Sequence, residues 1–521
     1  MKNYIKYLPF LALGVISCEP ELDNPIDEDG FYTNGETDFS NYVALGNSLT
    51  AGYADGALYI TGQETSYPNI MAQQFAKVQE TQLFNQPLVN DNAGGLLLAG
   101  NQITDNRRVL AVGANGNPRP QIYTGMQPTT DITNVLTGSF NNMGVPGAKS
   151  FHLVAPGYGD ISGVPVGTAN PYFVRFASNP SSTILADAAA QNPTFFSLFI
   201  GNNDVLSYAT SGGVGVDQTG NLDPRTYGPN DITDPQVFAS VYSTIVNTMV
   251  GTGADGALVN LPDVTSIPFF TTVPNNALVL DAATAANLTG FFQAVAGIFA
   301  QGAIQQGVDP AVAQGLAAQY ALKFNEGPNR FLVDVPVTQT NPLGFRQMTS
   351  DELLVLTIDQ GALAQGYGSV VLTPEVLQVL GILQTGGQPT PAQAQLVLAA
   401  VSGVDDKDAL DKDELAAISA AQTSYNATIK ALADANGLAF VDARSTLAQV
   451  ANGGISFDGG VVTSQFVTGG GFSLDGVHPT PRGYALVANT IIEAINQTYN
   501  STVPKVNIGN YGTVTLSNDV Q

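Results

Sequence analysis

The stretch VALGNSLTAGY at residues 43–53 places a serine directly after a short apolar run. Val43, Ala44 and Leu45 are typical of a buried strand, and the residues after Ser48 are compatible with a helix. A serine between a strand and a helix either caps the helix or is presented at the sheet edge as a nucleophile. The rest of the sequence has to distinguish these two interpretations.

Four further short runs, most of them apolar, end in or lead into Gly, Asn or Asp, as buried parallel strands do when the loops after them carry function. Helical patterns lie between some of the runs. Strands that alternate with helices predict an α/β domain built on a parallel sheet. The expected strands are residues 42–45, 139–145, 195–200, 257–261 and 438–441, and the clearest expected helices are residues 66–78, 235–250 and 414–436.

Residues 265–413 interrupt this pattern with Ala- and Gln-rich helical stretches separated by Gly and Pro loops. The segment is too long for one crossover, so we interpret it as a mostly helical insertion, either a lid over the site or a remote structural addition. The α/β core is then divided into residues 38–264 and 414–500. Residues 501–521 form a C-terminal tail that could add a short hairpin.

Residues 1–17 are predicted to be a lipoprotein signal peptide. Two lysines precede the apolar run 8–16, which is too short to span a bilayer. VISC at residues 15–18 resembles a bacterial lipobox, in which the cysteine is lipidated, and Cys18 is the only cysteine in the chain. Residues 18–37 are acidic and are expected to be a flexible tether. We therefore expect a lipid-anchored protein of the bacterial outer membrane, facing either the periplasm or the outside.

The charge balance limits the partners. The chain has 43 acidic and 18 basic residues and a net charge of −25, which nucleic acids and anionic membrane surfaces repel. We expect no nucleic-acid partner, and membrane contact only through the lipid anchor. GTGADG at residues 251–256 follows a helix and precedes a strand, the reverse of dinucleotide binding. With two widely separated histidines and no cysteine in the mature fold, no metal or cofactor is expected.

Only His152 and His478 could serve as a base for a nucleophilic serine. His478 lies in DGVHPTPRG, shortly before a helix that is expected to begin at Pro481. Asp475 is three residues upstream in a Gly-containing turn, where its carboxylate can orient one imidazole nitrogen and leave the other facing the serine. His152 has no nearby acidic residue and is interpreted as structural.

Ester chemistry also requires N–H donors at the point where negative charge develops on the substrate oxygen. Asn203 follows the apolar run 195–200 in the sequence IGNND and can offer its side-chain amide. Gly144, in NMGVPG, lies near the end of another expected strand, where its backbone N–H can approach a ligand. The N–H of Ser48 itself, at a helix start, is the third candidate donor.

The segments GNSLTAGY, NMGVPG, GNND and DGVHP occur in the order of the sequence blocks of the SGNH (GDSL-type) hydrolase family, which this chain resembles over residues 40–265 and 415–500. The resemblance implies a flavodoxin-like three-layer α/β/α fold and ester hydrolysis through an acyl-serine intermediate. It implies that Ser48 is the nucleophile, that His478 is the base oriented by Asp475, and that Ser48, Gly144 and Asn203 form the oxyanion hole. The family usually has Asp where this chain has Asn47.

The sequence thus predicts a serine esterase or acylhydrolase that acts on an ester-bearing small molecule, a lipid or an acylated glycan. The alternative is a weakly active or inactive lipoprotein with the same fold that binds glycans or lipids, and an assembly or adhesion component is a third class. No motif indicates the acyl chain length, the alcohol or the oligomeric state.

Overall fold

The computed structural model describes residues 31–113 and 116–520. The predicted signal peptide, the lipidation site Cys18 and the tether residues 18–30 therefore lie outside the described residues. The last part of the predicted tether is held on the core instead of being free. The Thr33 N–H donates to Thr502 Oγ1 at 2.8 Å, and the Glu36 N–H donates to the Tyr499 carbonyl at 2.8 Å.

A five-stranded sheet lies at the centre of the molecule, and all of its neighbouring strands are parallel. Its strands are the five that the sequence predicts, which confirms an α/β class with a parallel sheet. Counted along the chain, the spatial order is 2-1-3-4-5. The strands are β1 (Tyr42–Gly46), β7 (Asn142–Gly144), β8 (Phe195–Phe199), β9 (Asp255–Val259) and β18 (Ala439–Val441), in the order β7-β1-β8-β9-β18.

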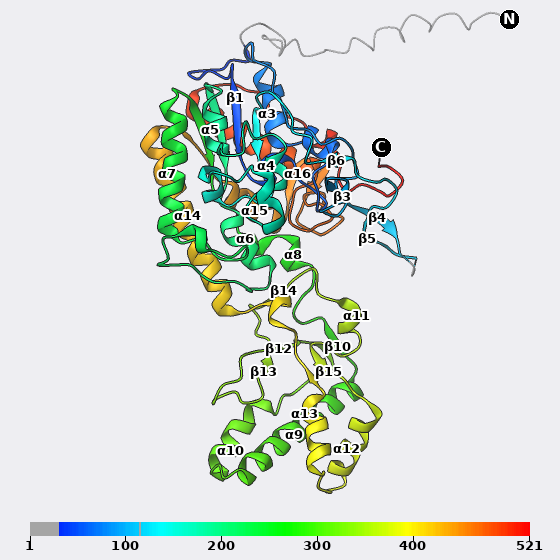
Figure 1. Cartoon of the computed structure of the whole chain (residues 1–521). Helices are drawn as coiled ribbons and strands as arrows, with labels where there is room; N and C mark the ends of the chain where they lie inside the picture. Colours follow the sequence, from blue (N-terminus) through cyan, green and yellow to red (C-terminus); the bar gives the residue numbers. More distant parts are fainter. Residues whose placement is uncertain (1–30, 114–115, 521) are drawn as a thin grey trace, which may run out of the picture.

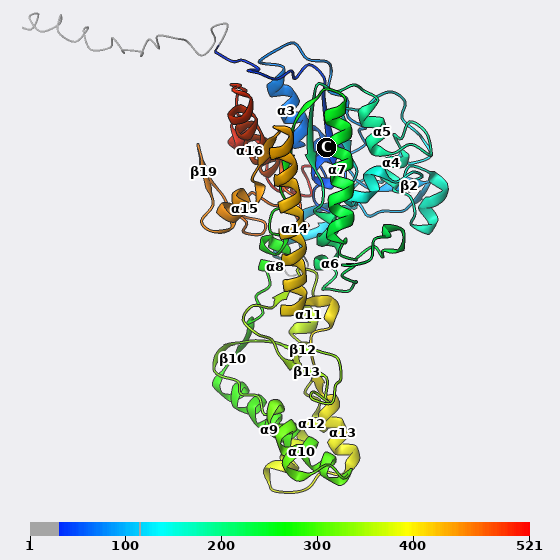
Figure 2. The same ribbon diagram turned by 90° about the vertical axis from the view of Figure 1, so that its left-hand side faces the viewer.

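Helices cover both faces of the sheet (Figures 1 and 2), and every residue of β1 and β8 is buried. On one face, the Phe195 ring contacts Phe75 of α3 and Tyr499 of α16, with ring centroids 5.6 and 6.0 Å apart. Because successive side chains of a strand point to opposite faces, Phe196 lies toward the other helical layer. The first layer contains α3 (Tyr67–Phe75) and α16 (Pro481–Tyr499), and the second contains α5 (Ile184–Ala189), α7 (Pro235–Gly251) and α14 (Lys412–Asn436).

Small sheets that the sequence did not indicate lie beside the core. A hairpin of β4 (Arg108–Val112) and β5 (Pro118–Ile122) stands next to a three-stranded sheet of β2 (Leu96–Leu98), β3 (Asn101–Gln102) and β6 (Thr130–Asp131). The C-terminal tail does not form the hairpin that was considered for it. Over residues 501–520 it instead runs first along α16, where the Val506 N–H donates to Asn489 Oδ1 at 2.8 Å, and reaches β4 near its end, where the Leu110 N–H donates to the Thr515 carbonyl at 2.9 Å.

The insertion forms a second lobe with its own apolar core (Figure 1). Its helices lie within the segment that the sequence predicts to be mostly helical, and each begins after an Asp or Thr whose side chain caps the first turn. One of them, α9, is apolar and long enough to cross a membrane by length and composition, but its Phe292 and Val295 are buried in the lobe's core. The helices are α9 (Ala282–Gln305), α10 (Pro310–Ala317), α12 (Pro374–Gln384) and α13 (Pro391–Ala399).

Short antiparallel pairs, which the sequence did not indicate, and the loops beside them form a neck that joins the helical tip of this lobe to the core. The pairs contribute to both apolar cores. Leu354 and Leu410 belong to the main core, whereas Leu332 and Val370 belong to the core of the insertion. The pairs are β10 (Leu278–Leu280) with β11 (Gly327–Asn329), β12 (Leu332–Asp334) with β13 (Phe345–Gln347), β14 (Leu353–Leu354) with β17 (Ala409–Leu410), and β15 (Ser369–Val370) with β16 (Val401–Ser402).

Candidate active site

Ser48 lies just beyond the carboxyl end of β1, in the first turn of the short helix α1 (Ser48–Ala51). Asn47 caps this turn, because its Oδ1 accepts a hydrogen bond from the Leu49 N–H at 3.0 Å. The strand can turn so sharply into the helix because position 46 is glycine. A Cβ on Gly46 would lie 2.0 Å from Thr50 Oγ1 and 2.5 Å from the Phe199 carbonyl oxygen.

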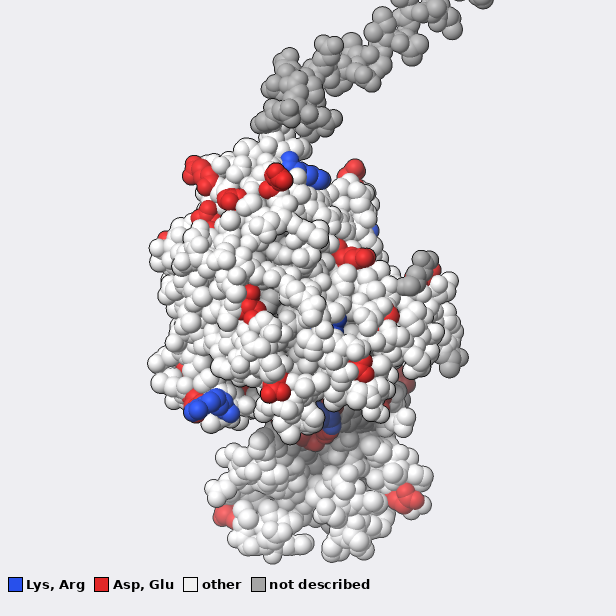
Figure 3. Space-filling view, turned by 45° about the horizontal axis from the view of Figure 1, so that its top comes forward, with Lys and Arg blue, Asp and Glu red and all other residues white. Residues whose placement is uncertain are grey.

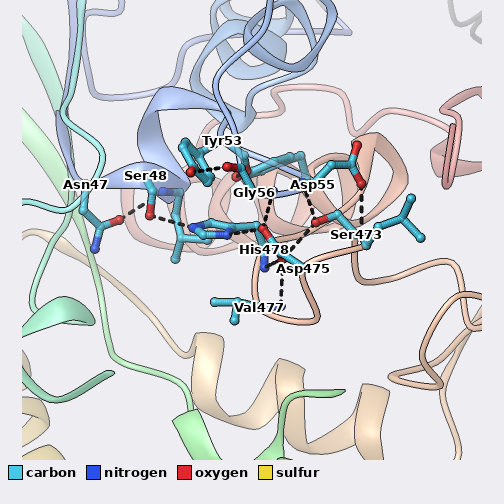
Figure 4. A network of polar contacts seen from close by, with 12 residues as sticks. Asn47, Ser48, Tyr53, Asp55, Gly56, Ser473, Asp475, Val477 and His478 are labelled. Atoms are coloured by element: carbon cyan, nitrogen blue, oxygen red, sulfur yellow. Dashed lines mark hydrogen bonds and ion pairs between the residues drawn. The ribbon is translucent and has the colours of Figure 1, made fainter. Parts of the chain in front are cut away.

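The structure brings Ser48, His478 and Asp475 into one line of hydrogen bonds (Figure 4). Ser48 Oγ lies 2.8 Å from His478 Nε2, and His478 Nδ1 lies 2.8 Å from Asp475 Oδ2. The loop that carries His478 ends where Thr480 caps α16 by accepting a hydrogen bond from the Gly483 N–H. The predicted helix start at Pro481 therefore fixes the position of the histidine.

The carboxylate of Asp475 is surrounded by donors. Its Oδ1 accepts from the Val477 and His478 N–H groups at 2.9 Å, and its Oδ2 accepts from the Gly56 N–H at 2.9 Å. Burial by itself would raise the pKa of the Asp475 carboxyl, but the adjacent His478 and these donors outweigh it and hold the pKa below its ordinary value. The ionised carboxylate favours a proton on Nδ1 of the imidazole, which leaves Nε2 to accept from the serine hydroxyl.

A buried ion pair behind Asp475, which the sequence did not indicate, holds the loop in place. Arg107 Nη2 lies 2.6 Å from Asp55 Oδ2, and both side chains are almost fully buried. Asp55 accepts a hydrogen bond from the Leu474 N–H and donates its own N–H to Ser473 Oγ, each at 2.9 Å. Ser473 Oγ in turn donates to Asp475 Oδ1 at 3.1 Å, so the pair is linked to the catalytic candidate through one side chain.

Asn203 is the first residue of α6 (Asn203–Thr210), which follows β8. Its Nδ2 donates to the Ala148 carbonyl at 2.9 Å, and since a carboxamide has two N–H groups, the second can serve another acceptor. Asn203 lines the same apolar cavity as Ser48 and His478. The structure therefore places the three predicted side chains around one space.

Gly144 differs from its predicted role. Its N–H donates to Asn142 Oδ1 at 3.0 Å, and a Cβ there would lie 2.3 Å from the Ala51 nitrogen. Position 144 is therefore glycine because β7 passes close to α1, and its N–H is engaged within the protein instead of facing a substrate oxygen.

Gly147 is the better candidate for the backbone donor. It has φ +80°, and the Ala148 N–H donates to the Val145 carbonyl at 3.1 Å, as in a type II turn with Pro146 at its second position. Among the residues that the structure describes, the Gly147 N–H has no acceptor. Because Gly144 is in register with Gly46, the turn extends beyond the sheet beside Ser48. The Pro-Gly pair is the sequence signal that would have indicated this residue.

The residues after this turn are anchored by buried charges. Asp204 is fully buried and accepts from the Ser150 N–H at 2.8 Å and from Ser150 Oγ at 2.6 Å. Burial raises the pKa of the Asp204 carboxyl, although Ser150 and Lys149 act in the opposite direction. Lys149 is buried as well, and its Nζ donates to the Asp231 carbonyl at 2.6 Å. It holds two loops together and does not face solvent.

His152 has a structural role, as the sequence indicates. Its Nδ1 accepts from the Lys149 N–H at 3.0 Å, and its ring stacks on Tyr158 with centroids 4.3 Å apart. Burial, together with the charge of Lys149, lowers the pKa of His152 to about 3. The imidazole is therefore neutral near pH 7.

Two hollows meet at His478. One is an open cleft of about 530 Å³ lined by Tyr53, Arg108, Asn203 and, from the insertion, Leu356. The other is a more enclosed apolar cavity of about 130 Å³ that begins at Ser48. The neck of the insertion thus forms one wall of the site, while its helical tip lies away from it (Figure 2).

Comparison of the chain with models of protein families, with curated proteins and with solved structures finds no match. Within residues 31–113 and 116–520, no group of three or more His, Cys, Asp or Glu side chains could hold a metal ion. The geometry around Ser48 is therefore the basis for assigning a function.

Proposed function

We propose that this protein is a serine acylhydrolase of SGNH type that cleaves carboxylic esters through an acyl-serine intermediate. The observation that carries the proposal is the line of hydrogen bonds from Ser48 through His478 to Asp475 at the carboxyl edge of the sheet. The strand order 2-1-3-4-5 supports it, because flavodoxin-like folds have this order and bind ligands where the order reverses, between their first and third strands. Ser48 follows the first of these strands and Asn203 the third.

Acylation begins when His478 Nε2 takes the proton of Ser48 Oγ, which attacks the ester carbonyl carbon. The carbonyl oxygen becomes an oxyanion that the N–H groups of Ser48 and Gly147 and the amide of Asn203 stabilise. The imidazolium then donates its proton to the alcohol oxygen as the carbon–oxygen bond breaks. The acyl group remains on Ser48, and the alcohol leaves through the open cleft.

Deacylation repeats these steps with water. His478 removes a proton from a water molecule that attacks the acyl carbon, and the same donors hold the second oxyanion. The proton then returns to Ser48 Oγ as the acid leaves. Asp475 stays ionised throughout and stabilises the imidazolium, in keeping with its lowered pKa.

The departure from the family pattern at Asn47 is compatible with this chemistry. Asn47 Nδ2 donates to Asn202 Oδ1 at 3.4 Å, a bond that an Asp at this position cannot donate. Its Oδ1 keeps the capping contact to Leu49 that an Asp would also make. The residue supports the turn and does not enter the proton transfer.

The test is hydrolysis of p-nitrophenyl butyrate by purified protein and four variants. Ser48→Ala and His478→Ala are expected to lower turnover by about 10⁴-fold or more, and Asn203→Ala by about 10²–10³-fold. His152→Ala serves as the matched histidine control and is expected to keep most of the activity. Equal losses in both histidine variants, or turnover that is independent of Ser48, would contradict the proposal and favour a lipoprotein that only binds its ligand.

The predicted lipid anchor places this activity in the bacterial envelope. Lipidation of Cys18 would hold the enzyme at a membrane surface, with substrates reaching it from the aqueous phase or from the membrane. Metabolic labelling with a fatty-acid analogue, compared between the native chain and Cys18→Ala, tests this part of the proposal. Equal labelling of the two chains would contradict it.

A further inference from the structure

The apolar cavity beside Ser48 has no part in the proton transfers described above. At one end it is lined by the polar groups of the site, including Ser48, Asn203 and His478. From there it extends over the carboxyl ends of β9 and β18 to the space between α15 (Ala443–Ala451) and α16. At that far end its walls are Val441, Leu447, Val450, Val462, Leu486 and Val487.

The strands that contribute lining residues show the direction in which this cavity extends. It begins beside β1 and reaches Val441 of β18, three strands away in the order β1-β8-β9-β18. Neighbouring strands lie about 4.8 Å apart, so the strands at the two ends of the cavity are about 14 Å apart, and the side chains that project from both ends shorten the free space between them. It is therefore elongated and begins where the acyl group would be attached.

The cavity suits an apolar group of limited size. Beyond the polar end, which is formed by Ser48, His478 and the asparagines at positions 47, 202 and 203, its lining is apolar except for two threonines and the hydroxyl of Tyr484, which already donates to the Tyr53 carbonyl. Its volume of about 130 Å³ is close to that of the engineered cavity of about 150 Å³ that binds benzene. A chain of about six carbon atoms is therefore the size of group that fills it.

We propose that this cavity binds the acyl chain, and that the preferred substrates are esters of unbranched medium-chain fatty acids of about six to eight carbons. The carbonyl lies at Ser48, the chain enters the cavity, and the alcohol remains in the open cleft. This inference rests on the proposed function. Each methylene that enters the cavity leaves water, which favours hexanoyl and octanoyl over acetyl esters until the cavity is full.

The far wall explains the upper limit on chain length. Thr446, Leu486 and Thr490 line both the cavity and a separate cleft on the surface between α15 and α16. These side chains are the partition between the two spaces. Removing part of the partition should join them and let a longer chain pass through.

The experiment measures kcat/KM for p-nitrophenyl acetate, octanoate and palmitate. The native chain is expected to prefer octanoate to acetate by about 10-fold or more. Val450→Phe fills the far end and should lower the octanoate-to-acetate ratio by about 10-fold, and the smaller change Val487→Leu should lower it in the same direction. Leu486→Ala should raise the palmitate-to-octanoate ratio. Val461→Phe, on a half-exposed side chain outside the cavity, is the matched control and should change neither ratio.

The outcomes separate this inference from the proposed function. If turnover depends on Ser48 but none of the cavity variants changes the ratios, the inference is overturned and the proposed function stands. If no ester is turned over in a Ser48-dependent way, the proposed function fails, and octanoate is then tested as a ligand by thermal shift. Stabilisation of the native chain but not of Val450→Phe would keep the cavity as a fatty-acid site. Equal or absent stabilisation would overturn it.

Discussion

The ion pair of Asp55 and Arg107 shows how single residues behind the site determine its geometry. Asp55 has φ +56°, a left-handed conformation that costs energy for a residue with a Cβ, and Asn and Asp tolerate it best. In this conformation its side chain reaches Arg107 and the Leu474 N–H, and its backbone reaches Ser473. The loop that presents Asp475 and His478 is thus built on a buried charge pair.

We expect Asp55→Asn to destabilise the protein by about 3–5 kcal/mol, because it leaves the buried Arg107 without a counter-charge. Asn also tolerates positive φ and keeps an acceptor for the Leu474 N–H. The decrease in the free energy of unfolding therefore reports the loss of the negative charge. Urea denaturation measures it. Asp223→Asn breaks the exposed pair with Arg225 and should leave the midpoint unchanged. Equal effects of the two variants would contradict the argument.

The neutral His152 makes stability depend on pH. Its pKa is about 3 in the folded protein and 6.5 ordinarily, so between these values the unfolded chain binds a proton that the folded chain does not. Stability that is present above pH 6.5 is therefore lost as the pH falls, at up to about 1.4 kcal/mol per pH unit. We expect His152→Phe, which can still stack on Tyr158, to lose about 2 kcal/mol less between pH 7 and pH 5 than the native chain. Parallel pH profiles would contradict this expectation.

At the scale of elements, the parts that local pattern determines were predictable. The five strands are apolar runs with Gly, Asn or Asp at or near their ends, and the start of α16 follows from Thr480 and Pro481. The position of Ser48 follows from the carboxyl end of β1 at the sheet edge, and the positions of Asp475 and His478 follow from the start of α16.

The parts that distant contacts determine were not predictable. Arg107 meets Asp55 across 52 residues, and nothing in the sequence around either residue indicates the pairing. The short antiparallel pairs of the insertion neck contain two or three residues per strand. Alternation of apolar and polar residues over so few positions does not predict a strand. The sequence analysis takes Gly144, at the end of a strand, as the backbone donor of the oxyanion hole. The structure instead favours Gly147, which lies three residues later in the Pro146-Gly147 turn.

Gly476 couples the neck of the insertion to the loop that carries Asp475 and His478. It has φ +74°, and a Cβ there would lie 2.7 Å from Leu356 Cδ2 and 3.2 Å from the Phe269 nitrogen. The Phe269 N–H donates to the Gly476 carbonyl, and the Leu356 N–H donates to the Phe269 carbonyl. The loop between Asp475 and His478 therefore has the insertion directly behind it.

We expect Gly476→Ala to lower turnover by about 10²-fold while the protein stays folded, because a shift of about 1 Å in the loop misplaces His478. Ester hydrolysis and circular dichroism measure the two effects. Gly437→Ala is the matched control, since Gly437 ends α14 with φ +65° and has open space where the Cβ would be. It should cost about 1–2 kcal/mol of stability and leave turnover unchanged. Similar turnover in both variants would show that the neck does not position the histidine.

At the scale of the whole molecule, the two lobes differ in surface as well as in core. Acidic side chains are scattered over the core, whereas the helical tip of the insertion is nearly free of charges (Figure 3). Within residues 282–322 and 360–404, Asp309 and Glu375 are the only charged residues. These two ranges therefore contribute only −2 to the net charge of −25, and the stability of the insertion depends on its separate apolar core.

Two separate cores predict two cooperative units, which calorimetry can resolve as two transitions. Phe292 is fully buried in α9, where its ring contacts Phe324 and Phe345, and Phe196 is fully buried in β8. Each Phe→Ala change removes a buried ring and should cost about 3–5 kcal/mol in its own unit. We expect Phe292→Ala to lower only the transition of the insertion, and Phe196→Ala to lower only that of the core, which also carries the candidate site around Ser48. If either variant moved both transitions together, the neck would transmit stability between the lobes and the chain would unfold as one unit.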